Sequence, residues 1–174
     1  MPDTDRPPAI RAEEPRDRAA VRKVNEAAFE GPAEADLVEA IHRSGAAVVA
    51  LVAANHGALV GHVLFSPVSV EPATTRRLVG LGPMAVLPDF QRRGVGSLLV
   101  RDGLERCRTA GAEAVVVLGH TEYYPRFGFR PAHEFGLRSA YDVPPDVFMA
   151  LELVPGSLRS VSGLVRYHSA FPRV

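Results

Sequence analysis

One strand–helix–strand segment in the middle of the chain most limits what this sequence can fold into. Leu78 to Leu87 is an apolar, β-rich run that stops at Pro88, which has no N–H to donate to a neighbouring strand. A helical pattern follows from about Arg93 to Ala110, and Ala114 to Leu118 is a short apolar run typical of a buried parallel strand. Strand, helix and strand in this order predict a right-handed crossover unit, and therefore a sheet with a helix packed on it.

Strand and helix patterns alternate along the rest of the chain. Asn55, His56 and Gly57 separate two β-rich runs and predict a hairpin, because Asn and Gly tolerate the positive φ of tight turns. With the run that begins at Leu78, this hairpin predicts an antiparallel meander of three strands. We expect further strands at Pro8 to Ala12, Val48 to Ala54, Leu59 to Phe65, Val147 to Leu153 and Gly163 to Tyr167, and helices from about Asp17 to Phe29 and from Glu34 to Ser44.

Composition is that of one ordinary α/β or α+β domain spanning residues 1–174, with 47% apolar and 23% charged residues. Twenty Lys plus Arg balance twenty Asp plus Glu, so the formal net charge is zero, which argues against electrostatic, sequence-independent binding of nucleic acid. The only cysteine, Cys107, falls on the apolar stripe of the central helix, so we expect a core thiol and no internal disulfide. The N-terminal residues hold no apolar run for a signal peptide, and no stretch approaches the ~20 residues of a membrane helix. We therefore expect a cytoplasmic protein with no membrane or nucleic-acid partner.

The glycine-rich turn Q-R-R-G-V-G-S, from Gln91 to Ser97, joins the apolar strand to the central helix. Two glycines one residue apart let the backbone approach an anion closely, and the first N–H groups of a helix lack intrahelical partners. The guanidinium groups of Arg92 and Arg93 suit phosphate oxygens. The dinucleotide fingerprint would need a third glycine where Leu99 stands, and the Walker pattern would need a lysine that this turn lacks.

The same turn resembles the Gln/Arg-x-x-Gly-x-Gly/Ala pyrophosphate loop of the GNAT acyl-CoA-dependent N-acyltransferases. Leu81 to Pro88 resembles the family's strand before the loop, and Tyr124 to Phe129 resembles its Y-x-x-x-G-F segment. The resemblance is specific over Leu81 to Phe129 and follows the order of elements from about Ile10 to Leu153. It implies the α+β, three-layer GNAT fold: a mixed, mostly antiparallel sheet, helices on both faces and a splayed central pair of strands.

The resemblance also implies acetyl-CoA as cofactor. Backbone groups of the strand before the loop would pair with the pantetheine arm as an added strand would, and amides of the loop would hold the pyrophosphate. Carried over by position, the cofactor-binding residues are Met84, Ala85, Val86, Gln91, Arg92, Arg93, Gly94, Val95, Gly96 and Ser97, with no metal ligands expected.

For the proton that the departing thiolate needs, Tyr124 matches the family tyrosine that points at the cofactor sulfur. A phenol with an ordinary pKa near 10 stays protonated at neutral pH, so it can donate to a thiolate. Pro125 disfavours helical geometry at Tyr124, which leaves Tyr123 as the reserve candidate. An asparagine common in the family is replaced by Val117, and His120 could supply a polar contact instead. The general base stays open among Glu30, His62, Glu71 and His120.

The function that the resemblance implies is N-acetylation of a primary amine on a small molecule or peptide, by direct transfer in a ternary complex. A non-catalytic acyl-CoA sensor and an interaction protein on the same scaffold are the alternatives. The loops expected to bind the acceptor contain few acidic residues, so a polycation such as an aminoglycoside is not favoured. A homodimer stays open as an assembly. The acceptor loops are Phe29 to Glu34, Ser66 to Thr75 and Phe135 to Pro145.

Overall fold

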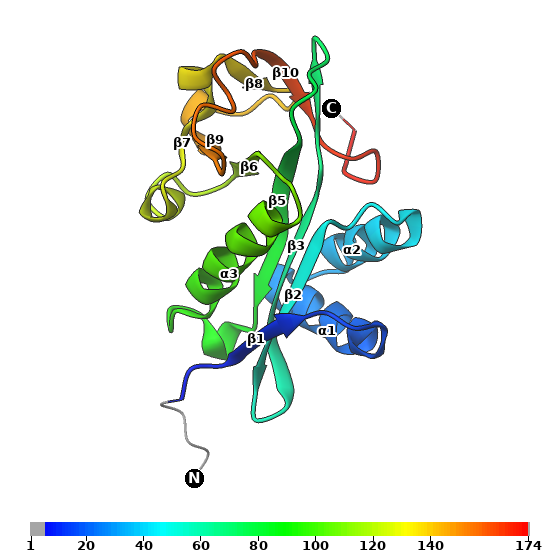
Figure 1. Ribbon diagram of the computed structural model, residues 1–174. Coiled ribbons are helices and arrows are strands. Elements are labelled where there is room, and N and C mark those ends of the chain that lie inside the picture. Colours follow the sequence, from blue (N-terminus) through cyan, green and yellow to red (C-terminus); the bar gives the residue numbers. More distant parts are fainter. Residues whose placement is uncertain (1–5, 174) are drawn as a thin grey trace.

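The computed structural model describes residues 6–173 and is built on a seven-stranded sheet (Figure 1). The strand order is β1-β2-β3-β5-β6-β9-β7, and every neighbouring pair is antiparallel except β5 and β6, which are parallel. The strands are β1 (Ala9–Ala12), β2 (Val49–Asn55), β3 (Ala58–Pro67), β5 (Leu78–Val86), β6 (Ala114–Leu118), β7 (Arg130–Pro131) and β9 (Phe148–Glu152). The predicted meander of β2, β3 and β5 and the crossover from β5 to β6 are therefore confirmed.

A second, three-stranded sheet lies beside one end of the large sheet and was not predicted (Figure 1). It has the order β4-β10-β8, in which β10 (Gly163–Arg166) corresponds to the run expected at Gly163 to Tyr167. Its other strands, β4 (Ser69–Glu71) and β8 (Leu137–Ser139), have three residues each. A run of that length is too short to show a period-2 pattern, which is why both escaped sequence reasoning.

Helices cover both faces of the large sheet, as expected (Figure 1). On one face, α1 (Arg18–Phe29) and α2 (Ala33–Ser44) pack on Val52 and Leu64. On the other face, α3 (Val95–Thr109) packs on an apolar cluster that includes Phe65. No helix within residues 6–173 is long and apolar enough to cross a membrane.

The packing of α3 is close enough to need small side chains. Cys107 is fully buried in the core cluster, which confirms the sequence interpretation, and burial raises the pKa of its thiol to about 12. A Cβ added at Gly103 would lie 2.4 Å from Cε2 of Phe65, so the helix approaches the sheet here only because position 103 has no side chain.

The parallel pair at the centre of the sheet is splayed. Only Leu78, Val79 and Gly80 of β5 have partners on β6, whereas β5 continues to Val86 and β6 to Leu118. Beyond Gly80 the two strands separate and leave a gap, and the N-terminus of α3 lies beside the far end of β5. This is the splayed pair that the GNAT resemblance implies.

Candidate active site

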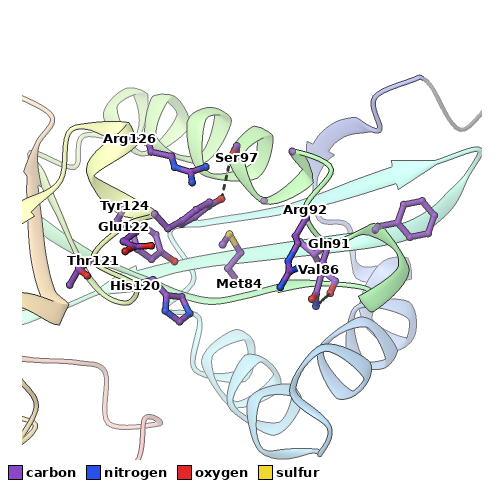
Figure 2. Close-up of a pocket in the computed structure, with 14 residues that line it drawn as sticks. Met84, Val86, Gln91, Arg92, Ser97, His120, Thr121, Glu122, Tyr124 and Arg126 are labelled. Carbon is purple, nitrogen blue, oxygen red and sulfur yellow. Dashed lines mark hydrogen bonds between the residues drawn. The ribbon is translucent and has the colours of Figure 1, made fainter.

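A cavity of about 930 Å³ occupies the gap between β5 and the segment that follows β6 (Figure 2). Met84 lies in its middle, Gln91 and Arg92 lie on one side, and His120 and Tyr124 lie on the other (Figure 2). The wall also includes Val86, Phe90, Gly94, Gly96, Ser97, Thr121, Glu122, Tyr123 and Arg126.

The start of α3 presents free backbone donors to this cavity. Gly94 is the N-cap with φ of 83°, and the first helical bond runs from the amide of Leu98 to the carbonyl of Gly94 at 3.1 Å. The amides of residues 95–97 precede that bond and therefore have no partner within the helix. Arg92 also has a positive φ, 60°, an uncommon conformation for a residue with a Cβ that is found preferentially at functional turns.

The register of β5 decides which of its backbone groups face the gap. The amide of Leu87 bonds to the carbonyl of Val60 on β3 at 2.9 Å, so by the alternation of an antiparallel ladder Ala85 also points to β3. Met84 and Val86 therefore direct their N–H and C=O groups away from β3, and the carbonyl of Val86 accepts a hydrogen bond from the Gln91 side chain at 3.0 Å.

Three residues from the expected cofactor-binding set do not line the cavity with their side chains. Ala85 is 2% exposed and holds the strand against β3. Val95 points into the core, and the Arg93 guanidinium lies over the Phe90 ring, 5.7 Å from its centroid. Any contact of these residues with a ligand is limited to the backbone.

The adjacent tyrosines Tyr123 and Tyr124 occupy different positions. The hydroxyl of Tyr123 lies 3.4 Å from Oγ of Ser97, which ties this ring to the start of α3. Tyr124 is 7% exposed and stacks edge-to-face on Phe129, and burial, with a smaller contribution from Tyr123, raises the pKa of its phenol to about 12. A Cβ added at Gly119 would lie 2.2 Å from the Tyr124 ring, so a glycine at this position makes room for it.

A second cavity, of about 670 Å³, meets the first. Met84, His120 and Tyr124 line both cavities and mark the junction between them. The rest of the second wall comes from the end of α1, the start of α2, residues 81–83 of β5, residues 118–119 at the end of β6, residues 141–143 and the C-terminal segment Tyr167, Phe171 and Pro172.

Two of the three expected acceptor loops contribute to this second wall. Phe29 and Glu34 come from the first loop, and Tyr141 and Asp142 come from the third. Residues 66–75, all of which are described, do not line it; their place is taken by the C-terminal segment, which the sequence reasoning did not include. The hydroxyl of Tyr141 donates to the carbonyl of Pro172 at 2.6 Å and fastens that segment to the wall.

Comparison with known proteins agrees with this geometry. The sequence model of the Acetyltransferase (GNAT) family matches residues 18–129. The chain belongs to the GNAT family. It is 36% identical over 165 residues to the Escherichia coli K12 N-acetyltransferase YhbS, covering 94% of this chain and 98% of that protein. It is 38% identical over 134 residues to the N-acetyltransferase YjhQ of the same strain, covering 75% and 74%.

Two solved GNAT structures share the fold over nearly the whole chain. One is the crystal structure of E. coli YhbS in complex with CoA, with a TM-score of 0.91 and 34% identity, covering 99% of this chain and 96% of that one. The other is a GNAT acetyltransferase from Brucella melitensis in complex with acetyl-CoA, with a TM-score of 0.79 and 37% identity, covering 94% and 97%.

The structure separates the four candidate bases of this GNAT domain. His62 is fully buried in β3, away from both cavities, and Glu71 pairs with Arg166 at 3.2 Å in the small sheet. Glu30 is the exposed C-cap of α1 and lines neither cavity. Of the four, only His120 lines the cavities, and it lies where they meet.

His62 instead belongs to a buried polar cluster beneath α1 and α2. Its Nε2 lies 2.9 Å from Oε2 of Glu13, and Nε2 of His42 lies 3.0 Å from the same oxygen. The Asn25 amide lies 3.3 Å from Nδ1 of His62 and also donates to the carbonyl of Val21 at 3.0 Å. Because Asn25 donates to Nδ1, the proton of His62 is on Nε2 and donates to Glu13.

This cluster joins four separate elements. Glu13 follows β1, Asn25 is on α1, His42 is on α2 and His62 is on β3. Burial alone would raise the pKa of Glu13, but the hydrogen bonds from the two histidines outweigh it and lower that pKa to about 2. The cluster thus fastens the helical layer to the sheet through an ionised carboxylate.

Proposed function

We propose that this chain transfers the acetyl group of acetyl-CoA to the primary amine of a small molecule or peptide, directly, within a ternary complex. The observation that carries the proposal is the meeting of two cavities at Met84, His120 and Tyr124. One cavity contains a helix N-terminus with free amides and two arginines, which suits an anionic cofactor. The other leads to the same point from the opposite side, where an amine could approach.

The residues of the first cavity fit CoA. The amides of residues 93–97 would hold the pyrophosphate, with Arg92 and Gln91 beside them, and the gap-facing backbone groups of Met84 and the amide of Val86 would pair with the pantetheine arm. The complexes of YhbS with CoA and of the Brucella protein with acetyl-CoA support this assignment.

Acetyl-CoA supplies the acyl group as a thioester, which a neutral amine attacks with loss of the thiolate. A backbone N–H of β5 that faces the gap would stabilise the oxyanion, and His120 would take the proton from the amine directly or through water. Tyr124, which is protonated at neutral pH with its ordinary pKa and more firmly so with the raised one, would donate to the leaving sulfur.

Two variants at the helix cap, one charged and one neutral but of equal size, test cofactor binding. The Cβ of Gly94 would point into open space, and φ there is 83°, a conformation that Asn and Asp tolerate. Gly94→Asp should abolish the thermal stabilisation given by acetyl-CoA, because a carboxylate would face the pyrophosphate, whereas the equally sized Gly94→Asn should retain most of it. Equal stabilisation of both variants would contradict the assignment of the loop.

A further inference from the structure

The second cavity carries information about the acceptor that the first does not. Most of its wall is apolar, with Phe29, Leu37, Leu81 and Phe171 among its side chains. Such a wall binds a ligand body by removing apolar surface from water, and it leaves a charged group inside without a partner. At about 670 Å³ the cavity lies within the ~300–1,000 Å³ range of small-molecule sites.

Within residues 6–173, arginines line only the first of the two cavities, although that cavity also includes the carboxylate of Glu122. Arg92 and Arg126 line the first cavity, whereas no Lys or Arg lines the second among the described residues. Glu34 and Asp142 line the second, the former partly exposed and the latter exposed. Their negative field favours entry of a cation, and their exposure places the charge toward solvent rather than deep in the apolar wall.

One polar group of the apolar wall has no partner within the protein. Tyr167 lines the second cavity, and its hydroxyl is buried without a hydrogen-bond partner among the described residues. That hydroxyl has almost no solvent-accessible surface, so a ligand in the cavity would meet the ring of Tyr167 and not its hydroxyl. The ring is held in place by Phe171, 5.0 Å away between ring centroids.

We propose that the acceptor is a monoamine carried on an apolar body, aliphatic or aromatic, and that amines with a second positive charge are poor acceptors. This inference rests on the proposed function for its reaction, although binding at the second cavity can be measured without turnover. The apolar body would lie against Leu37, Leu81 and Phe171, with its amine directed toward the junction at His120 and Tyr124.

A matched pair of amines tests the proposal. Hexylamine and 1,5-diaminopentane have chains of nearly equal length and differ in that a terminal methyl replaces an ammonium group. Thiol release from acetyl-CoA should give a kcat/KM for hexylamine at least about tenfold above that for the diamine, because the second ammonium would be desolvated against the apolar part of the wall, where no carboxylate pairs with it. Phenethylamine should rank with hexylamine, and spermidine and kanamycin should rank with the diamine.

A matched pair of variants ties this preference to the cavity. Leu37→Glu puts a carboxylate in the apolar wall and should reduce the ratio of kcat/KM for hexylamine to that for the diamine to about threefold or less. Leu37→Gln should lower kcat/KM for both amines without reversing their order. Phe171→Glu and Phe171→Gln repeat the test at a second apolar residue of the wall. An unchanged thermal stabilisation by acetyl-CoA shows that each variant is folded and that only the acceptor side has changed.

The outcomes separate this inference from the proposed function. Equal or faster acetylation of the diamine, spermidine or kanamycin would overturn the inference and leave the acetyltransferase function intact. Faster turnover with hexanoyl-CoA than with acetyl-CoA, together with loss of the preference for hexylamine, would mean that the cavity holds an acyl chain, and would also overturn it. If no amine is acetylated, the proposed function fails, but the inference can still be decided by calorimetric titration of hexylamine and the diamine, with and without CoA. Tighter binding of hexylamine than of the diamine supports the inference. Equal binding, or no binding, refutes it.

Discussion

Tyr124 and Tyr123 are neighbours in sequence, but the structure gives them different surroundings. Tyr124 reaches the junction of both cavities, whereas Tyr123 lines only the first and contacts Ser97. We therefore expect Tyr124→Phe to lower kcat by about 10²-fold or more with little change in the KM for acetyl-CoA, because only proton donation is lost. Steady-state kinetics checks this, with Tyr123→Phe as the control that should retain most of its kcat. Equal losses in kcat and cofactor affinity would mean that Tyr124 only shapes the pocket.

Gly119 has a role that depends on Tyr124. Its Cβ would lie 2.2 Å from the Tyr124 ring, so Gly119→Ala should displace the phenol and lower kcat by about tenfold or more, since misplacement of a catalytic group by an ångström can cost about 10²-fold. Gly57→Asn, in the turn between β2 and β3, is the control, because a Cβ there meets nothing within 4 Å, Asn tolerates the φ of 82°, and Gly57 lines neither cavity. An unchanged kcat in Gly119→Ala would show that the ring position is not needed for turnover.

At the residue scale, motifs pointed to the parts of the candidate site that are close in sequence, and the assignment of those residues to cofactor binding stays a prediction. The turn around Gly94 and the strand residues Met84 and Val86 follow one another along the chain, so spacing alone could indicate them. Gly119 could not be anticipated, because its need for a hydrogen side chain comes from a ring five positions later that folds back over it. The choice of His120 over His62 likewise needed three-dimensional placement, since both are single histidines near strands.

Among the elements, α3 and the sheet meet at Gly103, and two effects compete there. An alanine would favour the helix by about 1 kcal/mol, but its Cβ would lie 2.4 Å from the Phe65 ring, and overpacking typically costs about 1–3 kcal/mol. The net of the two effects is a loss, and we expect Gly103→Ala to lower the free energy of unfolding by up to about 2 kcal/mol in urea titrations. Adding Phe65→Leu should recover part of the loss, and a stabilised single variant would contradict the packing argument.

Element prediction succeeded where a run was long enough to show its period. The strands of the meander and all three α-helices were expected close to their observed bounds, because each has several apolar residues at regular spacing. The strands β4, β7 and β8 have only two or three residues, and tertiary pairing rather than local pattern creates them. The part played by Tyr167 to Pro172 in the second wall was missed for a related reason, since a loop that folds back leaves no periodic signal.

For the molecule as a whole, the Glu13 cluster sets a pH dependence of stability. The pKa of Glu13 falls from 4.5 to about 2 on folding, so its stabilising effect is present above the unfolded value and is lost as the pH decreases through that window. We expect Glu13→Gln to lower the free energy of unfolding near pH 7 by about 1–3 kcal/mol, because His42 and His62 exchange a charged acceptor for a neutral amide oxygen, and hydrogen bonds to charged groups are the stronger kind.

The difference in free energy of unfolding between the wild type and Glu13→Gln should shrink as the pH falls from about 5 toward 2, because the carboxylate of Glu13 in the wild type becomes protonated over that range. Urea titrations of both proteins at several pH values measure this. Glu14→Gln, which alters the neighbouring carboxyl at the surface, is the matched control. A difference between Glu13→Gln and wild type that is constant with pH would show that the carboxylate is not held ionised by His42 and His62.

The separation of β5 from β6 after only three paired residues also affects how the cofactor enters. Because the folded sheet already has this opening, the pantetheine arm would find its slot ready and would not have to break main-chain bonds of the sheet to reach it. The free energy needed to keep the two strands apart is then part of the folding equilibrium and does not weaken binding. Acetyl-CoA would add to an incomplete sheet rather than disrupt a complete one.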